Sequence, residues 1–152
     1  MILDSQLVFS DSQAVTATAV STNVYDTNAV AGPNTIQDIG NGEDIYLVVQ
    51  TAVTATDTGS DATLTITLES DSTTNLATSP TVHYSSGAIA FASFATAGTQ
   101  LIAVRLPAGN YERYLGVRYT VASGPLTAGQ FDAFLVKDIQ RNINYASGFS
   151  VA

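Results

Sequence analysis

The sequence predicts an all-β fold, a jelly roll or β-sandwich of about eight strands in two antiparallel sheets. Residues 63–69 alternate strictly between apolar and polar, which places Leu64, Ile66 and Leu68 on one face of a strand. Residues 45–49 form a continuous apolar run, typical of a strand buried on both faces or nearly so. Similar short runs recur along the chain with turn residues between them, and no segment has a convincing helical pattern. A layered, antiparallel arrangement follows.

In the first half of the chain, the apolar residues 7–9 are followed by the small, β-compatible residues 14–20. The stretch 26–42 contains two groups of glycine and asparagine, one of them with a proline, which predicts a long connection with turns. Its length suits a crossing between sheets better than a tight hairpin. The strand at 63–69 is expected to be half-exposed, and a short strand at 81–84 follows after a polar loop.

The second half begins with an alanine-rich stretch, residues 88–97, which suits a helix or a strand; we favour strand or loop. Residues 100–106 form a strand that ends at a proline and a glycine. Residues 113–121 and 131–137 alternate in the same way as 63–69 and are the last two expected strands. From Asp138 onward the sequence has the composition of a tail.

The length of 152 residues fits one domain over 1–152, with about 1–6 and 139–152 as possible extended arms. There are no cysteines, which excludes disulfides and thiolate metal sites. The formal net charge of −8, from 13 acidic and 5 basic residues, disfavours direct binding to nucleic acids or anionic membranes. With no secretory signal and no transmembrane span, we expect a soluble protein made in the cytoplasm.

Residues 57–60 read Asp-Thr-Gly-Ser, the signature around the catalytic carboxylate of aspartic proteases. That chemistry needs two aspartates that share a proton, and the chain has one copy of the motif. Only a homodimer would supply the second copy. These four residue types are also ordinary in a loop between strands, and we favour that interpretation.

Two further sets of residues are candidates for a functional site. The oxygen ligands of Asp57, Asp61, Glu69 and Asp71 suggest calcium, but no complete calcium-binding loop is present. His83 is the only histidine, and no Gly-x-Ser-x-Gly turn accompanies any serine, so we expect a structural role for it. We therefore predict no catalytic, cofactor or metal site and no enzymatic activity.

The scarce basic residues Arg105, Arg113 and Arg118 flank one turn that is rich in tyrosine. Arginine and tyrosine are favoured at protein interfaces, but surface pairs within the chain, such as Arg113 with Glu112 or Arg118 with a carboxylate, explain them equally well. The apolar terminal residues are either frayed ends or arms that order on a partner. The candidate interface residues are Ile2, Leu3, Tyr111, Arg113, Tyr114, Arg118, Tyr119, Tyr145 and Phe149.

Five segments together resemble a known family: residues 1–11, 38–43, 112–119, 124–129 and 134–138. In order and spacing they are similar to the jelly-roll capsid cement, or decoration, proteins of tailed bacteriophages, of the type found on the short-tailed Bordetella phage. The similarity runs nearly end to end and is weaker at 26–37 and 70–98.

This resemblance implies a non-enzymatic structural protein on the outer capsid surface of the virion, made in the bacterial host cytoplasm. Its partners would be the major capsid protein and further copies of itself, with a homo-oligomeric dimer favoured over a trimer. The resemblance implies no cofactor. The alternatives are a carbohydrate-binding β-sandwich of the virion surface, against which the absence of tryptophan counts, and the dimeric protease.

Overall fold

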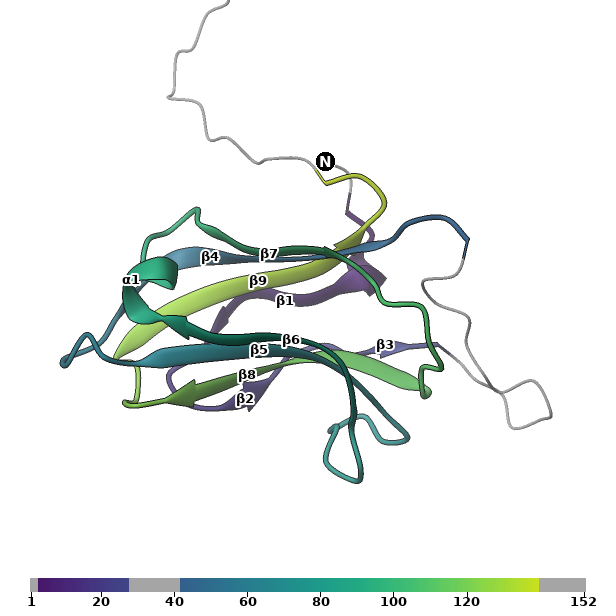
Figure 1. Ribbon diagram of the computed structural model, residues 1–152, viewed down its shortest axis with the longest axis horizontal. Coiled ribbons are helices and arrows are strands. Elements are labelled where there is room, and N and C mark those ends of the chain that lie inside the picture. The colour runs from purple at the N-terminus through teal and green to yellow at the C-terminus, as the bar shows by residue number, and fades with distance from the viewer. Residues whose placement is uncertain (1–2, 28–41, 140–152) are drawn as a thin grey trace, which may run out of the picture.

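The computed structural model describes residues 3–27 and 42–139, and this part of the chain is built almost entirely from strands (Figure 1). The strands are β1 (Val8–Ala14), β2 (Ala19–Val20), β3 (Tyr25–Asp26), β4 (Tyr46–Thr56), β5 (Thr63–Asp71), β6 (Thr81–Ala90), β7 (Gln100–Arg105), β8 (Tyr114–Ala122) and β9 (Ala128–Val136). A 3-10 turn, η1 (Ser5–Leu7), precedes β1, and a single helical turn, α1 (Phe91–Phe94), follows β6.

The strands form two antiparallel sheets that face each other. Sheet A has the order β1-β9-β4-β7, and sheet B has the order β2-β8-β5-β6, with β3 also paired to β8. Because β2 and β3 both pair with β8, they are two pieces of one edge. If β2 and β3 are counted as one edge strand, each sheet has four strands. Consecutive strands then lie in different sheets at every step except from β5 to β6. This is the topology of a jelly roll, which confirms the predicted fold class.

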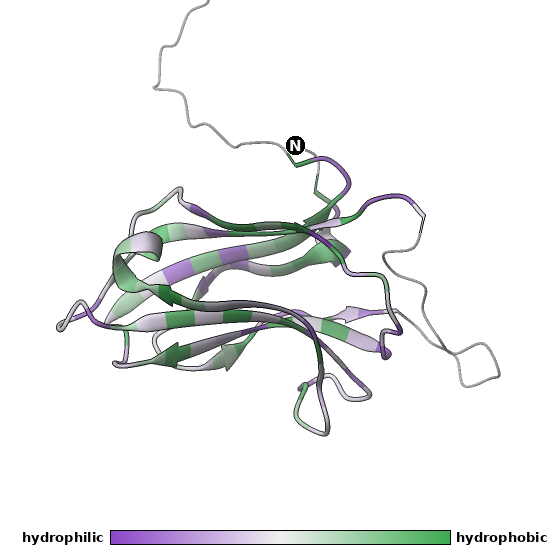
Figure 2. Cartoon of the chain, viewed as in Figure 1, coloured by the Kyte–Doolittle hydropathy of each residue, from purple (hydrophilic) through white to green (hydrophobic). Residues whose placement is uncertain are grey.

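The core lies between the two sheets. Leu64, Ile66 and Leu68 of β5 all point into it and are fully buried, as their alternation predicted. Leu47 and Val49 of β4 face them from sheet A. Each such side chain contributes about 1.5–3 kcal/mol through burial. Figure 2 shows the resulting alternation of apolar and polar residues along the strands of both sheets.

The outer face of sheet A also carries an apolar group. Val48, between Leu47 and Val49, must point to the opposite face, and it is buried there with Phe134 and Val136. This confirms that the run at 45–49 is buried on both faces. Asp132, Phe134 and Val136 share that face of β9, so β9 is buried on both sides near its end.

Sheet B differs from prediction in one respect. β5 is a central strand between β8 and β6, and its threonines are partly exposed as expected. Glu69, however, is only 4% exposed, and Ser70 and Asp71 are fully buried. The polar half of β5 is therefore covered at one end, because the following loop folds back over it.

Two boundaries also differ. The strand predicted at 81–84 continues to Ala90 in β6. The stretch 88–97, where we favoured strand or loop, is strand to Ala90 and then forms the single helical turn α1, with the Ala95 amide donating to the Phe91 carbonyl. The turn places Phe94 in the core against Phe131, which decides between the two local preferences.

The long connection after residue 26 joins β3 in sheet B to β4 in sheet A, so it crosses between the sheets as predicted. Residues 28–41 of that connection lie outside the described residues, as do 1–2 and 140–152.

Candidate protein interface

Arg113 is paired inside the chain. Its guanidinium forks onto the Asp26 carboxylate, with Nε and Nη2 each 2.9 Å from an oxygen, and lies 4.9 Å above the Tyr114 ring. The hydrogen bond to Asp26 raises the pKa of Arg113 above its usual value. The partner is thus Asp26 on β3, not the neighbouring Glu112 that the sequence suggested. Both charged groups remain about half-exposed and accessible at the surface.

Arg118 is also used within the chain. Its Nε lies 2.9 Å from Glu69 Oε2, and its Nη2 donates to the Leu76 carbonyl at 2.5 Å. The Glu69 side chain is 5% exposed and that of Arg118 is 25% exposed. Arg118 therefore fixes the loop after β5 onto the outer face of sheet B. The structure shows the internal Arg118–carboxylate pair that was one of the two interpretations of the sequence.

Tyr119 and Tyr111 lie in the core and do not face solvent. Tyr119 is fully buried, stacks on Phe131 and donates to Ser10 Oγ at 3.0 Å. Burial raises its pKa well above the usual value. Tyr111 is 2% exposed and donates to the Pro107 carbonyl. Neither ring is exposed for contact with a partner; for Tyr119 this follows from its inward-facing position on β8, whereas Tyr111 is buried in the loop before that strand.

The sequence did not reveal that Ser70 and His83 meet across β5 and β6, with Ser70 Oγ 2.7 Å from His83 Nε2. A serine beside a histidine is the start of a nucleophilic site. Here the Ser70 hydroxyl is fully buried and already receives the Glu112 amide at 3.1 Å. The pair therefore connects β5 and β6 with residues 106–113, a segment that we call the 106–113 loop.

The Asp57 carboxylate of the protease-like motif holds its own loop. Its Oδ2 accepts the amides of Asp61 and Ala62, both at 3.0 Å. These bonds, that of Ala62 above all, lower the pKa of Asp57. A carboxylate used in this way is a turn residue, which supports the loop interpretation.

Three of the four carboxylates considered for calcium, those of Asp57, Glu69 and Asp71, serve separate structures. Glu69 pairs with Arg118, whereas Asp71 accepts the Thr78 and Ser79 amides of the loop that follows it. In the described ranges, no group of three or more His, Cys, Asp or Glu residues is placed to hold a metal.

The two ends of the described chain lie close together at one end of sheet A. Figure 1 shows the N-terminal segment beside the end of β9. η1 contacts β9, and Val8 packs with Phe134 and Val136. Leu3 and Ile139 are large apolar residues that are both 39% exposed. The candidates Ile2, Tyr145 and Phe149 lie outside the described residues.

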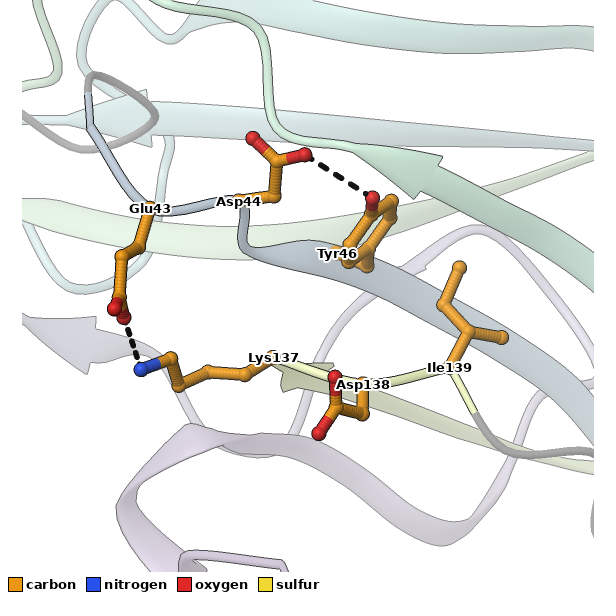
Figure 3. A pocket seen from close by; sticks show the side chains of 6 residues that line it. All are labelled: Glu43, Asp44, Tyr46, Lys137, Asp138 and Ile139. Atoms are coloured by element: carbon orange, nitrogen blue, oxygen red, sulfur yellow. Dashed lines mark hydrogen bonds and ion pairs between the residues drawn. The ribbon is translucent and has the colours of Figure 1, made fainter.

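An open hollow lies at this end of sheet A, and we call it the terminal hollow (Figure 3). Lys137 pairs with Glu43, and the Tyr46 hydroxyl donates to Asp44 at 3.3 Å. The Lys137 interaction lowers the pKa of Glu43. Both charged and apolar side chains line the terminal hollow; the lining residues are Glu43, Asp44, Tyr46, Lys137, Asp138 and Ile139.

The described residues hold no helix with the length and hydropathy that a membrane crossing requires. No curated protein matches the chain at a significant level. The comparison with known protein families matches residues 9–135 to Bbp16, a name that suggests a Bordetella phage protein. The match runs from the second residue of β1 to the last but one of β9, and so covers the whole jelly roll. The chain belongs to the Bbp16 family.

Proposed function

We propose that this protein is a capsid cement protein of a tailed phage, which binds the outer surface of the icosahedral shell and clamps neighbouring major capsid protein subunits. The observation that carries the proposal is the Bbp16 match across every strand of the jelly roll. The resemblance of five ordered segments to phage cement proteins points the same way.

The physical basis is linkage. A shell that holds packaged DNA is pulled apart at the seams between its subunits. A protein that binds across a closed seam, and not to separated subunits, adds its binding free energy to the assembled state. Many symmetry-related copies repeat that contribution over the whole shell. A rigid sandwich with a continuous core suits this role, because little conformational entropy is lost when it binds.

We place the shell contact at the terminal end of sheet A. Ile139 lines the terminal hollow and exposes its apolar side chain, and Leu3 is exposed to the same extent. The two ends of the described chain lie at this end of sheet A (Figure 1), so terminal arms that order on the shell would widen one contact. Arg113 and Tyr114 offer a second accessible surface, whereas Tyr111, Tyr119 and Arg118 are engaged within the fold.

The proposed role is non-enzymatic. The one serine–histidine pair found in the described residues has its hydroxyl buried. The one protease-like carboxylate in them is bound to its own loop. Both observations support a protein that acts by binding.

The test is co-sedimentation of the purified protein with phage shells that lack it. We expect wild type to pellet with shells, and both deletion of 140–152 and Ile139→Ser to weaken binding. Val53→Ser is the matched control, since Val53 is 47% exposed near the other end of β4. If wild type stays in the supernatant, the cement function is wrong. If all variants bind alike, the terminal contact is wrong.

Self-association is part of the same proposal, with a dimer favoured over a trimer. Sedimentation velocity of the free protein over a range of concentrations measures the species directly. A monomer at every concentration, including those at which shells are saturated, would contradict it.

Recognition of a host glycan by a virion-surface module remains the alternative. Tyr114, beside Arg113, is one of the partly exposed aromatic residues that such a site would use. A glycan array at high protein concentration decides this, and an array without hits removes the alternative.

A further inference from the structure

His83 lies where β6 carries an additional residue. The ladder between β5 and β6 pairs Leu68 with Tyr84 and Glu69 with Val82, so His83 has no counterpart. A bulge of this kind redirects a side chain relative to the regular alternation of a strand. The His83 ring is half-buried and is directed at the end of β5 and at the 106–113 loop, which joins sheet A to sheet B.

The imidazole makes two contacts that tie this loop down. Its ring stacks on Tyr111 with the centroids 3.9 Å apart and the planes at 21°. Its Nε2 lies 2.7 Å from Ser70 Oγ, and the same oxygen accepts the Glu112 amide at 3.1 Å. Tyr111 and Glu112 are adjacent in the 106–113 loop, so His83 and Ser70 together attach that loop to β5 and β6.

The hydrogen bonds are complete when His83 is neutral and carries its proton on Nδ1. Ser70 Oγ accepts the Glu112 N–H, and in this tautomer Nε2 accepts the Ser70 hydroxyl hydrogen. A protonated Nε2 is a donor instead. The Ser70 hydroxyl would have to accept two N–H groups and turn its hydrogen away, inside a fully buried site. A buried donor without an acceptor destabilises the arrangement.

The surroundings of His83 affect its pKa in two opposite directions. Burial lowers the pKa of His83, and the Glu112 carboxylate, which accepts from Thr81, opposes this more weakly. The loop also contributes Tyr111, whose pKa is raised to about 12 by burial, so it is uncharged near neutral pH. β6 contributes the phenol of Tyr84. On β5, Ser70 is uncharged, while Glu69 and Asp71 are engaged by Arg118 and by the loop after β5.

The direction in which stability changes with pH follows from the lowered pKa of His83. The stabilisation that the neutral ring provides is fully present above the unfolded-state value of 6.5. It is lost as the pH falls from 6.5 through the lower value of the folded state. Mild acid therefore weakens these contacts, and neutral pH restores them.

We propose that His83 is a pH-responsive latch, whose neutral ring holds the 106–113 loop on sheet B and whose protonation releases it. The loop ends with Arg113, directly before Tyr114 at the start of β8. Its release therefore alters an accessible surface of the protein. The latch acts within the chain and does not depend on the cement function.

The test uses the full-length protein and the fact that His83 is its one histidine. NMR follows the single imidazole from about pH 8 to about pH 5. Amide exchange of Tyr111 and Glu112, corrected for the intrinsic effect of pH, is measured in parallel. We expect the protection of both amides to fall several-fold along the imidazole titration curve.

Two variants separate the latch from general acid loosening. His83→Gln keeps a hydrogen-bond acceptor for Ser70 and does not titrate, so its loop protection should be independent of pH in this range. His83→Phe keeps the stack on Tyr111 and should also be independent of pH, with lower protection throughout. The proposal is overturned if the wild-type ring titrates without any change in the loop. It is equally overturned if His83→Gln loses protection with pH as wild type does.

Discussion

At the scale of single residues, Gly116 on the outer face of β8 is tightly confined by its neighbours. A Cβ there would lie 2.9 Å from Leu76 Cδ1 and from Val24 Cγ1, and 3.2 Å from Ser21 Oγ. Leu76 itself is fully buried and has a positive φ of 49°, so the loop that places it has little freedom to move. Gly116 is therefore needed for a close approach.

Gly116→Ala is expected to destabilise the protein by about 1–3 kcal/mol, because the added methyl group overpacks this contact. Gly109→Ala is the matched control, since a Cβ at Gly109 meets nothing within 4 Å. Urea unfolding followed by circular dichroism measures both. Equal stability of the two variants would show that the loop over Gly116 yields easily.

Arg118 on β8 and Arg113 just before this strand should respond differently to substitution by alanine. Arg118→Ala leaves Glu69 buried without its cation, which costs about 3 kcal/mol. Arg113→Ala breaks a pair of half-exposed groups and should change stability little. Thermal unfolding of the two variants measures the difference. If Arg113→Ala is the more damaging, the assignment of Arg118 as the internal anchor is incorrect.

At the scale of elements, each of the loops on either side of β5 is held by one carboxylate. Asp57 accepts two amides of the loop before it. For Asp71, the last residue of β5, burial acts to raise the pKa, but hydrogen bonds from Thr78, Ser72 and Ser79 of the following loop outweigh it, and the pKa is lowered. Both ionised groups thus stabilise the loops that enter and leave the central strand of sheet B.

Because both pKa values lie below 3.8 in the folded state, this stabilisation is present above 3.8 and is lost as the pH falls below it. We expect Asp57→Asn with Asp71→Asn to flatten the fall of the melting temperature between about pH 4 and pH 2. Asp11→Asn, at an exposed position of β1, is the control. An unchanged slope in the double variant would contradict the assignment.

The strands were predictable where side-chain alternation met a single buried face, as in Leu64, Ile66 and Leu68. The run 45–49 was equally clear because it is buried on both faces. α1 was not predictable, since its alanines fit helix and strand alike and only the place of Phe94 in the core decides. The interface candidates Tyr111 and Tyr119 were chosen by residue type, which does not reveal that the fold buries both rings.

Contacts between distant residues could not be found from spacing. The Arg113–Asp26 pair and the Ser70–His83 pair join residues whose proximity depends on strand order, which periodicity does not reveal. The choice of Glu112 as the partner of Arg113 shows the limit. Glu112 accepts from Thr81 instead, whereas Asp26 lies on β3 and pairs with Tyr114, the residue directly after Arg113.

At the scale of the whole molecule, the net charge of −8 acts against self-association. Two copies repel over a distance of about 30 Å at 0.01 M salt and of about 8 Å at physiological salt. We therefore expect the proposed dimer to become tighter as salt is raised, measured by sedimentation equilibrium. A dimer that weakens with salt would instead be held by ion pairs, with the accessible Arg113 as the first candidate.

The central claim is that a jelly roll of the Bbp16 family binds the outside of a phage shell through the end of sheet A at which the described chain begins and ends. A cryo-EM reconstruction of the virion of the phage that encodes it tests this most directly. We predict a jelly-roll density on the outer surface, across the boundary between capsid subunits, with Leu3 and Ile139 facing the shell. A capsid surface without this density, or a bound domain with that end directed away from the shell, would contradict the claim.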